Sequence, residues 1–425
     1  MSLATPLRTP AEPAAPAGSA TMRRNNLALV LRHLQHQGPR SRADIVVETR
    51  LSKATVSSLV AELVDRGLVR EGALRQEGAI GRPARILEVD GSRVGALGLE
   101  VNVDYIAVFG RDLGGQILVR RRVAFDAMNA TPDEALSRLA VMTREALAEM
   151  TRRGAVPAGI TVAIPGLIDV ARGHVLLAPN LGWREVPVAE RLAAELGAGI
   201  PVRVDNDANL SALAEFREGS AAGTADLVYL TGEVGVGGGV IVGGRLLRGP
   251  DGFAGEVGHM SVDPGGIECG CGRRGCWETK VGLAALVRLA TPDQGYAAPG
   301  PVPDPEVRLA GILDMAAAGD QPTHLAFAEV GRWLGLGCSI LVNLFNPHVL
   351  VLGGYFARVA QFVVPTAQAE LDRLVLAGQA GMCRIEASTL GFEAAVRGGC
   401  GVAIERVLDD PTSVPPVTVV QSGIR

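Results

Sequence analysis

The spacing of apolar side chains changes from helical to strand-like within the first 90 residues. Two stripes at i, i+3, i+4 and i+7 predict helices: Leu27, Val30, Leu31 and Leu34 in the first, and Val56, Leu59, Val60 and Leu63 in the second. Gly38-Pro39 ends the first helix, while Ser41-Arg-Ala-Asp44 and Ser52 are suitable starts for two more. Strand-like runs follow at 68–71 and 85–89. This order predicts a helix-turn-helix followed by a hairpin wing.

The last of these helices carries the polar side chains that a DNA groove could accept. Its candidate DNA-binding residues are Lys53, Thr55, Ser57 and Ser58, joined by Arg82 in the wing sequence Gly81-Arg-Pro83. Small hydroxyls and a lysine near a helix N-terminus can reach base edges in the major groove, and a rigid exposed arginine suits a narrow minor groove. A plain three-helix bundle with a polar face is the structural alternative.

From residue 94 onward, short apolar runs alternate with helical patterns. Strands are expected at 94–99, 105–109, 117–125, 160–164, 201–204, 227–231, 240–242 and 349–352, and helices at 132–153, 279–290, 305–319, 323–345, 358–376 and 392–408. Alternating strands and helices predict an α/β fold with a central sheet. We found no uninterrupted apolar run of about 18 residues, so we expect no membrane span.

Length and composition divide the 425-residue chain into a tail, two domains and a second tail. Residues 1–21, rich in Pro and Ala, are expected to be disordered; 22–90 form the DNA-binding domain, 94–408 the α/β domain, and 409–425 a C-terminal tail. Residues 22–86 have a net charge of +6 and the remainder has −10. A basic module on an acidic body favours a polyanion partner for that module alone.

Half of the six cysteines lie in one short stretch. Cys269, Cys271 and Cys276 have C-x-C-x4-C spacing among glycines, and His259 lies ten residues upstream. Three thiolates and an imidazole converging on one ion are typical of structural zinc. Three buried or loosely paired thiols are the alternative. Grouped cysteines without an export signal predict a reducing, cytoplasmic setting.

The same stretch resembles a known family. Gly-Glu256-Val-Gly-His259 followed by Cys269-Gly-Cys-Gly-Arg-Arg-Gly-Cys276-Trp-Glu278 is similar to the signature of the ROK family, named for repressors, open reading frames and kinases. The resemblance implies a two-lobed fold like that of sugar kinases and actin, preceded here by the winged helix-turn-helix of xylose-repressor-like regulators. It implies that the motif at 256–278 holds zinc through His259 and the three cysteines.

The resemblance also implies a sugar site. Its expected residues are Gly166, Asn180, Asn206, Asp207, Glu256, His259 and Glu278. Asn206 can hydrogen-bond hydroxyls as donor and acceptor. Asp207 matches the catalytic base of ROK kinases, although it could also cap the helix that follows.

Two functions compete: an ATP-dependent sugar kinase and a sugar-responsive repressor. ROK kinases carry Asp-x-Gly-Gly-Thr after the first strand, whereas this chain has Glu100-Val-Asn-Val-Asp104. Val101 and Val103 would obstruct the close approach of phosphates, and Glu233 would repel them. The glycine-rich run 235–239 could instead serve hairpin geometry.

We therefore predict a regulator whose ROK domain has lost ATP binding and catalysis, with Asp207 a vestigial base. The expected partners are operator DNA, a monosaccharide effector and a second copy, as a homodimer or homotetramer. Xylose and other pentoses, glucose and N-acetylated hexosamines all remain open as effectors. Operator sequence, and repressor versus activator, are open as well.

Overall fold

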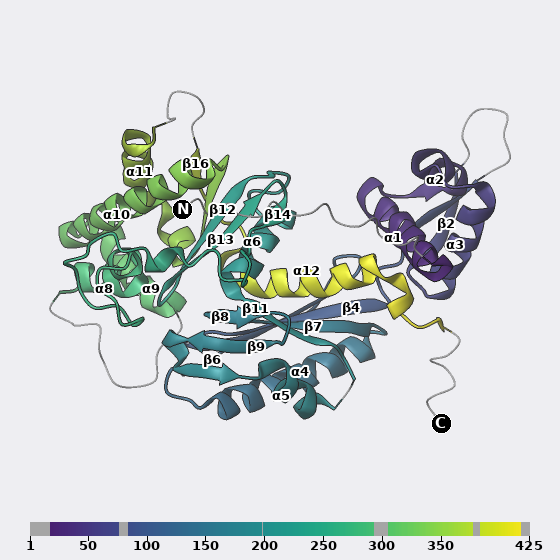
Figure 1. Cartoon of the computed structure of the whole chain (residues 1–425). Coiled ribbons are helices and arrows are strands. Elements are labelled where there is room, and N and C mark those ends of the chain that lie inside the picture. The colour runs from purple at the N-terminus through teal and green to yellow at the C-terminus, as the bar shows by residue number, and fades with distance from the viewer. Residues whose placement is uncertain (1–17, 76–83, 198, 293–304, 377–382, 418–425) are drawn as a thin grey trace, which may run out of the picture. The chain divides into compact units, whose positions relative to one another are not determined.

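The computed structural model describes residues 18–75, 84–197, 199–292, 305–376 and 383–417 (Figure 1). The chain divides into two compact units. The N-terminal unit consists of residues 1–91 together with 406–425, and the central unit of residues 92–405. Of the predicted disordered tail, residues 1–17 lie outside the described residues, as do Arg82 in the wing and most of the loop at 291–304.

The N-terminal unit is a three-helix winged fold. Its elements are α1 (Ser19–Gln37), β1 (Arg40–Ser41), α2 (Arg42–Thr49), α3 (Lys53–Asp65), β2 (Val69–Arg75) and β3 (Ala84–Val89), with sheet order β1-β3-β2. Both predicted apolar stripes are buried. The Ser41 side chain accepts from the backbone N–H of Asp44, whose carboxylate accepts from Ser41 in return, and Ser52 caps α3. The predicted helix starts are therefore correct. The first helix begins at Ser19, three residues before the predicted domain boundary.

The central unit contains two five-stranded sheets with the same strand order. The first has the order β11-β7-β4-β5-β6, and the second β16-β15-β12-β13-β14. In each, an antiparallel meander of three strands continues into two parallel strands. The strands of the first are β4 (Val94–Val101), β5 (Tyr105–Asp112), β6 (Ile117–Ala124), β7 (Val156–Ile164) and β11 (Val202–Asn206). Those of the second are β12 (Leu227–Gly232), β13 (Val236–Val242), β14 (Arg245–Leu246), β15 (Val349–Gly354) and β16 (Arg384–Ala387). The repeated order agrees with the two-lobed fold expected from the sequence.

Helices pack around these sheets (Figure 1). They are α4 (Pro132–Arg152), α5 (Val188–Leu196), α6 (Asp207–Glu218), α7 (Glu278–Val281), α8 (Leu283–Ala290), α9 (Pro305–Ala317), α10 (Gln321–Phe345), α11 (Tyr355–Leu374) and α12 (Ala394–Asp409). Each sheet has its own hydrophobic core. Among the described helices, α10 has the length and composition to cross a membrane, but 61% of the relevant window is buried inside the protein. It is therefore packed as a core helix.

Two features of the central unit escaped the sequence patterns. A third sheet, β10-β9-β8, is formed by β8 (Leu167–Asp169), β9 (His174–Ala178) and β10 (Trp183–Val186), and α5 follows it. The helix expected at 279–290 is divided into α7 and α8 by Gly282. A β-carbon there would lie 2.8 Å from the carbonyl oxygen of Glu278, so glycine permits the break.

Candidate functional site

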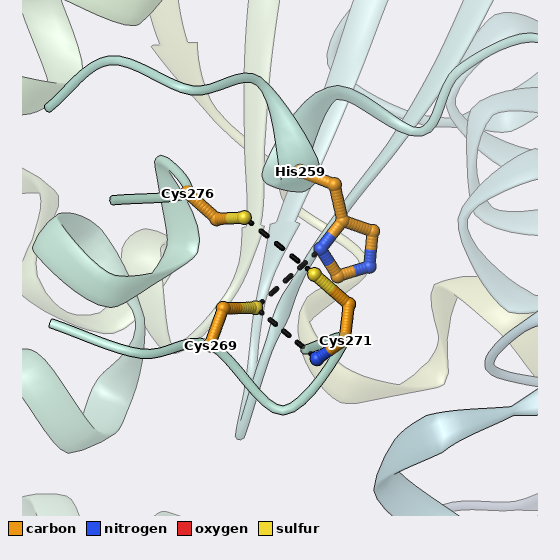
Figure 2. Close-up of side chains that lie close together, drawn as sticks. All are labelled: His259, Cys269, Cys271 and Cys276. Carbon is orange, nitrogen blue, oxygen red and sulfur yellow. Dashed lines mark hydrogen bonds between the residues drawn. The ribbon is translucent and has the colours of Figure 1, made fainter. Parts of the chain in front are cut away.

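The three clustered cysteines and His259 converge in the central unit, as Figure 2 shows. Their ligand atoms all lie within 4.8 Å of one another. The sulfur atoms of Cys271 and Cys276 are 3.6 Å apart, and Cys269 Sγ is 3.7 Å from His259 Nδ1. Three thiols and one imidazole in this space are a donor set suited to one tetrahedral ion. We name these four residues the Cys/His cluster.

The backbone around the cluster is folded by glycines and short bridges. Gly272 and Gly275 have φ angles of +83° and +66°, a region in which residues with side chains are strained. The N–H of Cys269 donates to the carbonyl of Arg273 at 2.7 Å, which closes the turn between the first two cysteines and the third. Next to Cys276, the buried Trp277 donates its indole N–H to Trp333 in α10 at 2.8 Å. The loop is thereby attached to the core.

Burial raises the pKa of the Cys269 thiol above its ordinary value, and a hydrogen bond to Glu278 raises it further. In that bond Cys269 Sγ lies 2.8 Å from Glu278 Oε1. A metal ion needs thiolates, so binding would displace such protons and free the Glu278 carboxylate. The cluster and Glu278 are thus chemically linked.

The central unit also encloses a cavity of about 710 Å³ whose wall includes the Cys/His cluster. We name it the central cavity. All seven residues expected at the sugar site line it: Gly166, Asn180, Asn206, Asp207, Glu256, His259 and Glu278. They come from both halves of the unit, from the end of β7 to the start of α7. The volume falls in the range of small-molecule sites.

Asn206 and Asp207 lie where β11 passes into α6. The cap of α6 is Asn206, whose side-chain oxygen accepts from the N–H of Asn209 at 2.9 Å, while its amide N–H donates to the carbonyl of Gly166 at 3.2 Å. The structural alternative in which Asp207 caps this helix is wrong, since Asp207 is already its first residue. Its carboxylate is left to face the cavity.

Two carboxylates of the cavity wall have raised pKa values. Burial raises the pKa of Asp207 to about 6 and that of Glu256 to about 7. The negative charges of Asp207 and Glu278 add to the shift of Glu256. Carboxyl groups in this state can either donate to or accept from a ligand hydroxyl at neutral pH.

A second polar group, containing two glutamates, reaches the cavity through Asn102 and Glu233. Asn102 Nδ2 donates to Glu100 at 3.1 Å and to Glu233 at 2.5 Å, and the Tyr105 hydroxyl donates to Glu100 at 2.8 Å. We name these four residues the carboxylate network. Burial raises the pKa of Glu100 to about 7, and the charge of Asp207 adds to that shift. Burial also raises the pKa of Glu233 well above its usual range, and the charge of Glu100 adds to that one.

Two family models match the chain: the ROK family over residues 96–406, and the MarR family over residues 28–76. The chain belongs to the ROK family. A xylose repressor from Bacillus spizizenii is 30% identical over 395 residues, spanning 92% of this chain and 98% of its own. A crystal structure of a ROK family transcriptional regulator, described as a homologue of the Escherichia coli Mlc protein, superposes on this chain with a TM-score of 0.77 at 26% sequence identity. The match covers 93% of this chain and 99% of the regulator.

ROK kinases match only part of the chain. The structure of a ROK family glucokinase from Streptomyces griseus, in complex with glucose and AMPPNP, is 30% identical with a TM-score of 0.63. It covers 73% of this chain and 99% of its own. The ROK domain is therefore common to regulators and kinases, whereas the match to regulators extends further along the chain.

In this ROK domain, the loop after the first strand places its two valines differently. Val101 ends β4 and is buried in the core of the first sheet, whereas Val103 lines the central cavity. Both valines belong to the core of the first sheet, and of the two only Val103 also lines the cavity, where a ligand could contact it.

The glycines of the other loop serve packing. A β-carbon on Gly237 or Gly239 would lie 2.9 or 2.5 Å from Ala208 or Ala212 in α6. Gly238 is similarly close to Val257. Glycine is needed here because α6 and the loop before His259 pack directly on β13. This supports the structural interpretation of the glycine-rich run.

The candidate DNA-binding side chains lie on α3 of the MarR-like unit. Lys53, Ser57 and Ser58 are exposed, and Thr55 is half-buried with its hydroxyl 2.8 Å from that of Ser52. Ser58 accepts a hydrogen bond from Arg23 in α1 at 3.2 Å, so its hydroxyl oxygen already has a partner within the N-terminal unit.

Sequence reasoning missed several residues around the cavity. Asp205 forms a two-point ion pair with Arg248, at 2.9 and 2.6 Å, just before the Asn206 cap. Tyr105 belongs to the carboxylate network, and the Arg122 guanidinium lies 3.9 Å from the centre of its ring. These partners are far apart in the chain, and no local motif indicates them.

Proposed function

We propose that this protein is a transcriptional repressor that releases its operator DNA when a monosaccharide binds in the central cavity. The observation that carries this proposal is the extent of the match to the xylose repressor, 92% of this chain and 98% of the relative. The match to the glucokinase covers only 73% of this chain. The MarR family match lies at residues 28–76, outside the ROK match.

The Cys/His cluster is proposed to bind one zinc ion through Cys269, Cys271, Cys276 and His259 Nδ1. With Nδ1 on the metal, Nε2 carries the proton and becomes a fixed donor for a ligand. Zinc supplies structural order here, because four protein ligands leave no open position for chemistry. The metal would also release Glu278 from its hydrogen bond with Cys269.

The ligand proposed for the cavity is a neutral monosaccharide. Four carboxyl groups (Asp207, Glu233, Glu256 and Glu278) line the wall, and their negative charge disfavours anions such as sugar phosphates. Together with Asn180, Asn206 and His259, these carboxyl groups can accept hydrogen bonds from the hydroxyls of a sugar ring and donate hydrogen bonds to them. Xylose is the first candidate, by analogy with the relative named above.

Nucleotide binding is proposed to be lost. The carboxylate network joins Asn102 of the first half to Glu233 of the second, and these residues belong to the two segments that the family resemblance matches to phosphate loops. A polyphosphate would have to separate this hydrogen bond and lie against two carboxyl groups in a low-dielectric site.

The DNA partner is proposed to be read by α3, with Lys53, Thr55, Ser57 and Ser58 in the major groove and Arg82 in the minor groove. A homodimer or homotetramer would present two such units to inverted half-sites about 34–36 Å apart. The expected location is the cytoplasm.

A direct test begins by selecting high-affinity duplexes from a random DNA library with the full-length protein. Fluorescence anisotropy at fixed salt then follows binding of the selected duplex while xylose, glucose and N-acetylglucosamine are added in turn. The proposal predicts at least a tenfold loss of affinity with one of these sugars. Unchanged affinity with all three would contradict it, and tighter binding would show a response of opposite sign.

A sugar kinase fused to a DNA-binding unit is the second candidate function. It is favoured by Asp207, which begins α6 and lines the cavity. A coupled assay for ADP release with each sugar distinguishes the two, because the repressor proposal predicts no turnover above a catalyst-free control.

A further inference from the structure

The C-terminal residues form part of the N-terminal unit. Residues 406–425 group with residues 1–91, and Pro411 and Val414 are buried there. Sequence analysis described residues 409–425 only as a tail. The chain thus passes between the units twice, once at Gly91–Ser92 and once at Glu405–Arg406. The second passage lies inside a continuous helix, α12 (Ala394–Asp409).

The end of the chain contacts the helix proposed to read DNA. Arg66 caps the C-terminus of α3, and its Nη1 donates to the carbonyl oxygens of Val414 at 2.6 Å and Thr412 at 3.2 Å. The same guanidinium donates to Glu62 of α3 at 2.8 Å. A planar fork that satisfies several acceptors holds a fixed geometry. Arg66 therefore fixes the end of α3 to the segment that follows α12.

At its other end, α12 is packed against the first sheet and α6 with almost no space. Figure 1 shows α12 in yellow running beside β4 and β7. A β-carbon on Gly98 of β4 would overlap the carbonyl of Val396, and one on Gly398 would overlap the carbonyl of Leu210 in α6. The Cys400 thiol donates to Ala96 of β4 at 3.2 Å. These are backbone-to-backbone contacts, which cannot be absorbed by a side-chain rotation.

The elements that pack against α12 also lead to residues of the central cavity. β4 leads to Asn102, β7 leads to Gly166, and the N-terminus of α6 holds Asp207. A displacement of these ends on ligand binding would be carried to α12, because tightly packed interiors shift as units.

We propose that α12 is the element that couples the central cavity to α3, through the embedded glycines at one end and the Arg66 contacts at the other. The coupling rests on the sugar-responsive function proposed above. The role of Arg66 in holding α3 is independent of that function, because it concerns DNA affinity without ligand.

The first experiment interrupts α12 in the full-length protein. A flexible Gly-Ser-Gly-Gly-Ser-Gly insertion is placed between Glu405 and Arg406, and the matched control carries the same insertion between Gly91 and Ser92. Xylose, glucose and N-acetylglucosamine are tested on each for melting temperature and for affinity to the selected duplex.

We expect both insertion variants to keep the ligand-induced rise in melting temperature and to bind DNA. The α12 insertion should reduce the ligand effect on DNA affinity to within about twofold, while the control keeps most of it. A full response in the α12 variant, or equal loss in both variants, would overturn the coupling. Absence of a response in the unmodified protein would instead reject the proposed function, and the coupling with it.

The second experiment tests Arg66 without ligand. Arg66→Ala and Arg66→Lys should each lower affinity for the duplex by about tenfold, because lysine cannot donate to both carbonyls at once. Arg32→Ala is the matched control: Arg32 also meets the C-terminal segment, at Asp409, but from α1. It should change affinity by less than about twofold. If Arg66→Lys keeps full DNA affinity, Arg66 acts as a positive charge facing DNA and not by holding the C-terminal segment. If Arg32→Ala lowers affinity as much as Arg66→Ala does, the contact with α3 is no more important than the contact with α1.

Discussion

The two sides of the central cavity use acidic residues in opposite ways. Near the Cys/His cluster, Glu256 and Glu278 line the wall, and the loop that bears them is folded by glycines and cysteines. In the carboxylate network, Glu100 and Glu233 are joined through Asn102, and Glu100 is buried while Glu233 is half-buried. On the first side the polar groups face the cavity, whereas on the second side they hydrogen-bond to one another. This difference is the basis for the proposal that the cavity accepts a sugar and excludes a nucleotide.

The largest expected effect comes from removing a metal ligand. Cys276→Ala should abolish bound zinc, measured by elemental analysis, and with it the rise in melting temperature that a sugar produces, because the loop carrying Glu256, His259 and Glu278 loses its brace. Cys383→Ala is the matched control, a buried cysteine outside the cluster. Stoichiometric zinc in Cys276→Ala would contradict this account of the cluster.

A smaller effect is expected at the carboxylate that begins α6. Asp207→Asn keeps the size of the side chain but replaces one acceptor oxygen with an amide donor and removes the charge, so sugar affinity should fall by about 10–100-fold, the cost of a charged hydrogen bond. Calorimetric titration of the effector sugar measures it. An unchanged affinity would place the sugar elsewhere.

These two predictions draw on the part of the site that the sequence revealed. The Cys/His cluster could be predicted because its ligands lie within 18 residues of one another and their chemistry is specific. The helix caps at Ser41 and Ser52 and the buried stripes were predictable for the same reason, since each depends on neighbours a few residues away.

What the sequence did not reveal depends on distant partners. Asn102 and Glu233 are 131 residues apart, and Arg66 and Val414 are 348 apart. Such pairs are set by how strands and helices pack. The choice of Asn206 over Asp207 as the cap of α6 depended on where β11 ends, which periodicity fixes only to within a few residues.

The carboxylate network predicts a pH effect on stability. Glu100 has a folded pKa of about 7, above its ordinary value near 4.5, mainly because it is buried. The folded state therefore binds more protons than the unfolded state between these values, so stability falls as pH rises through that window. Around Glu233, the charges of Glu100, Asp104 and Asp207 act in the same direction, and Arg122 opposes them.

Removing one charge should weaken that pH dependence. Glu233→Gln should raise the melting temperature at pH 8 and raise it less at pH 5, because the raised pKa of Glu233 makes its charged form unfavourable in the folded state and a lower pH leaves less of that form. Thermal unfolding at both pH values measures this. A variant that is less stable than the unmodified protein at pH 8 would show that the network is held by a charge pair instead.

The smallest effect on sugar affinity is expected for a change in the carboxylate network. Asn102→Ala should leave sugar affinity within about twofold, because Asn102 is committed to Glu100 and Glu233. The same change should lower the free energy of unfolding by about 1–3 kcal/mol, the cost of leaving buried acceptors unpaired. A large loss of sugar affinity would mean that the network itself contacts the ligand.

The central claim is that the cavity binds a sugar and no longer binds a nucleotide, and one calorimetric measurement tests it directly. The full-length protein is saturated with whichever of xylose, glucose and N-acetylglucosamine raises its melting temperature most, and is then titrated with MgATP up to millimolar concentration. The account predicts a binding isotherm for the sugar and only heat of dilution for MgATP. A saturable MgATP isotherm of one nucleotide per chain would contradict it.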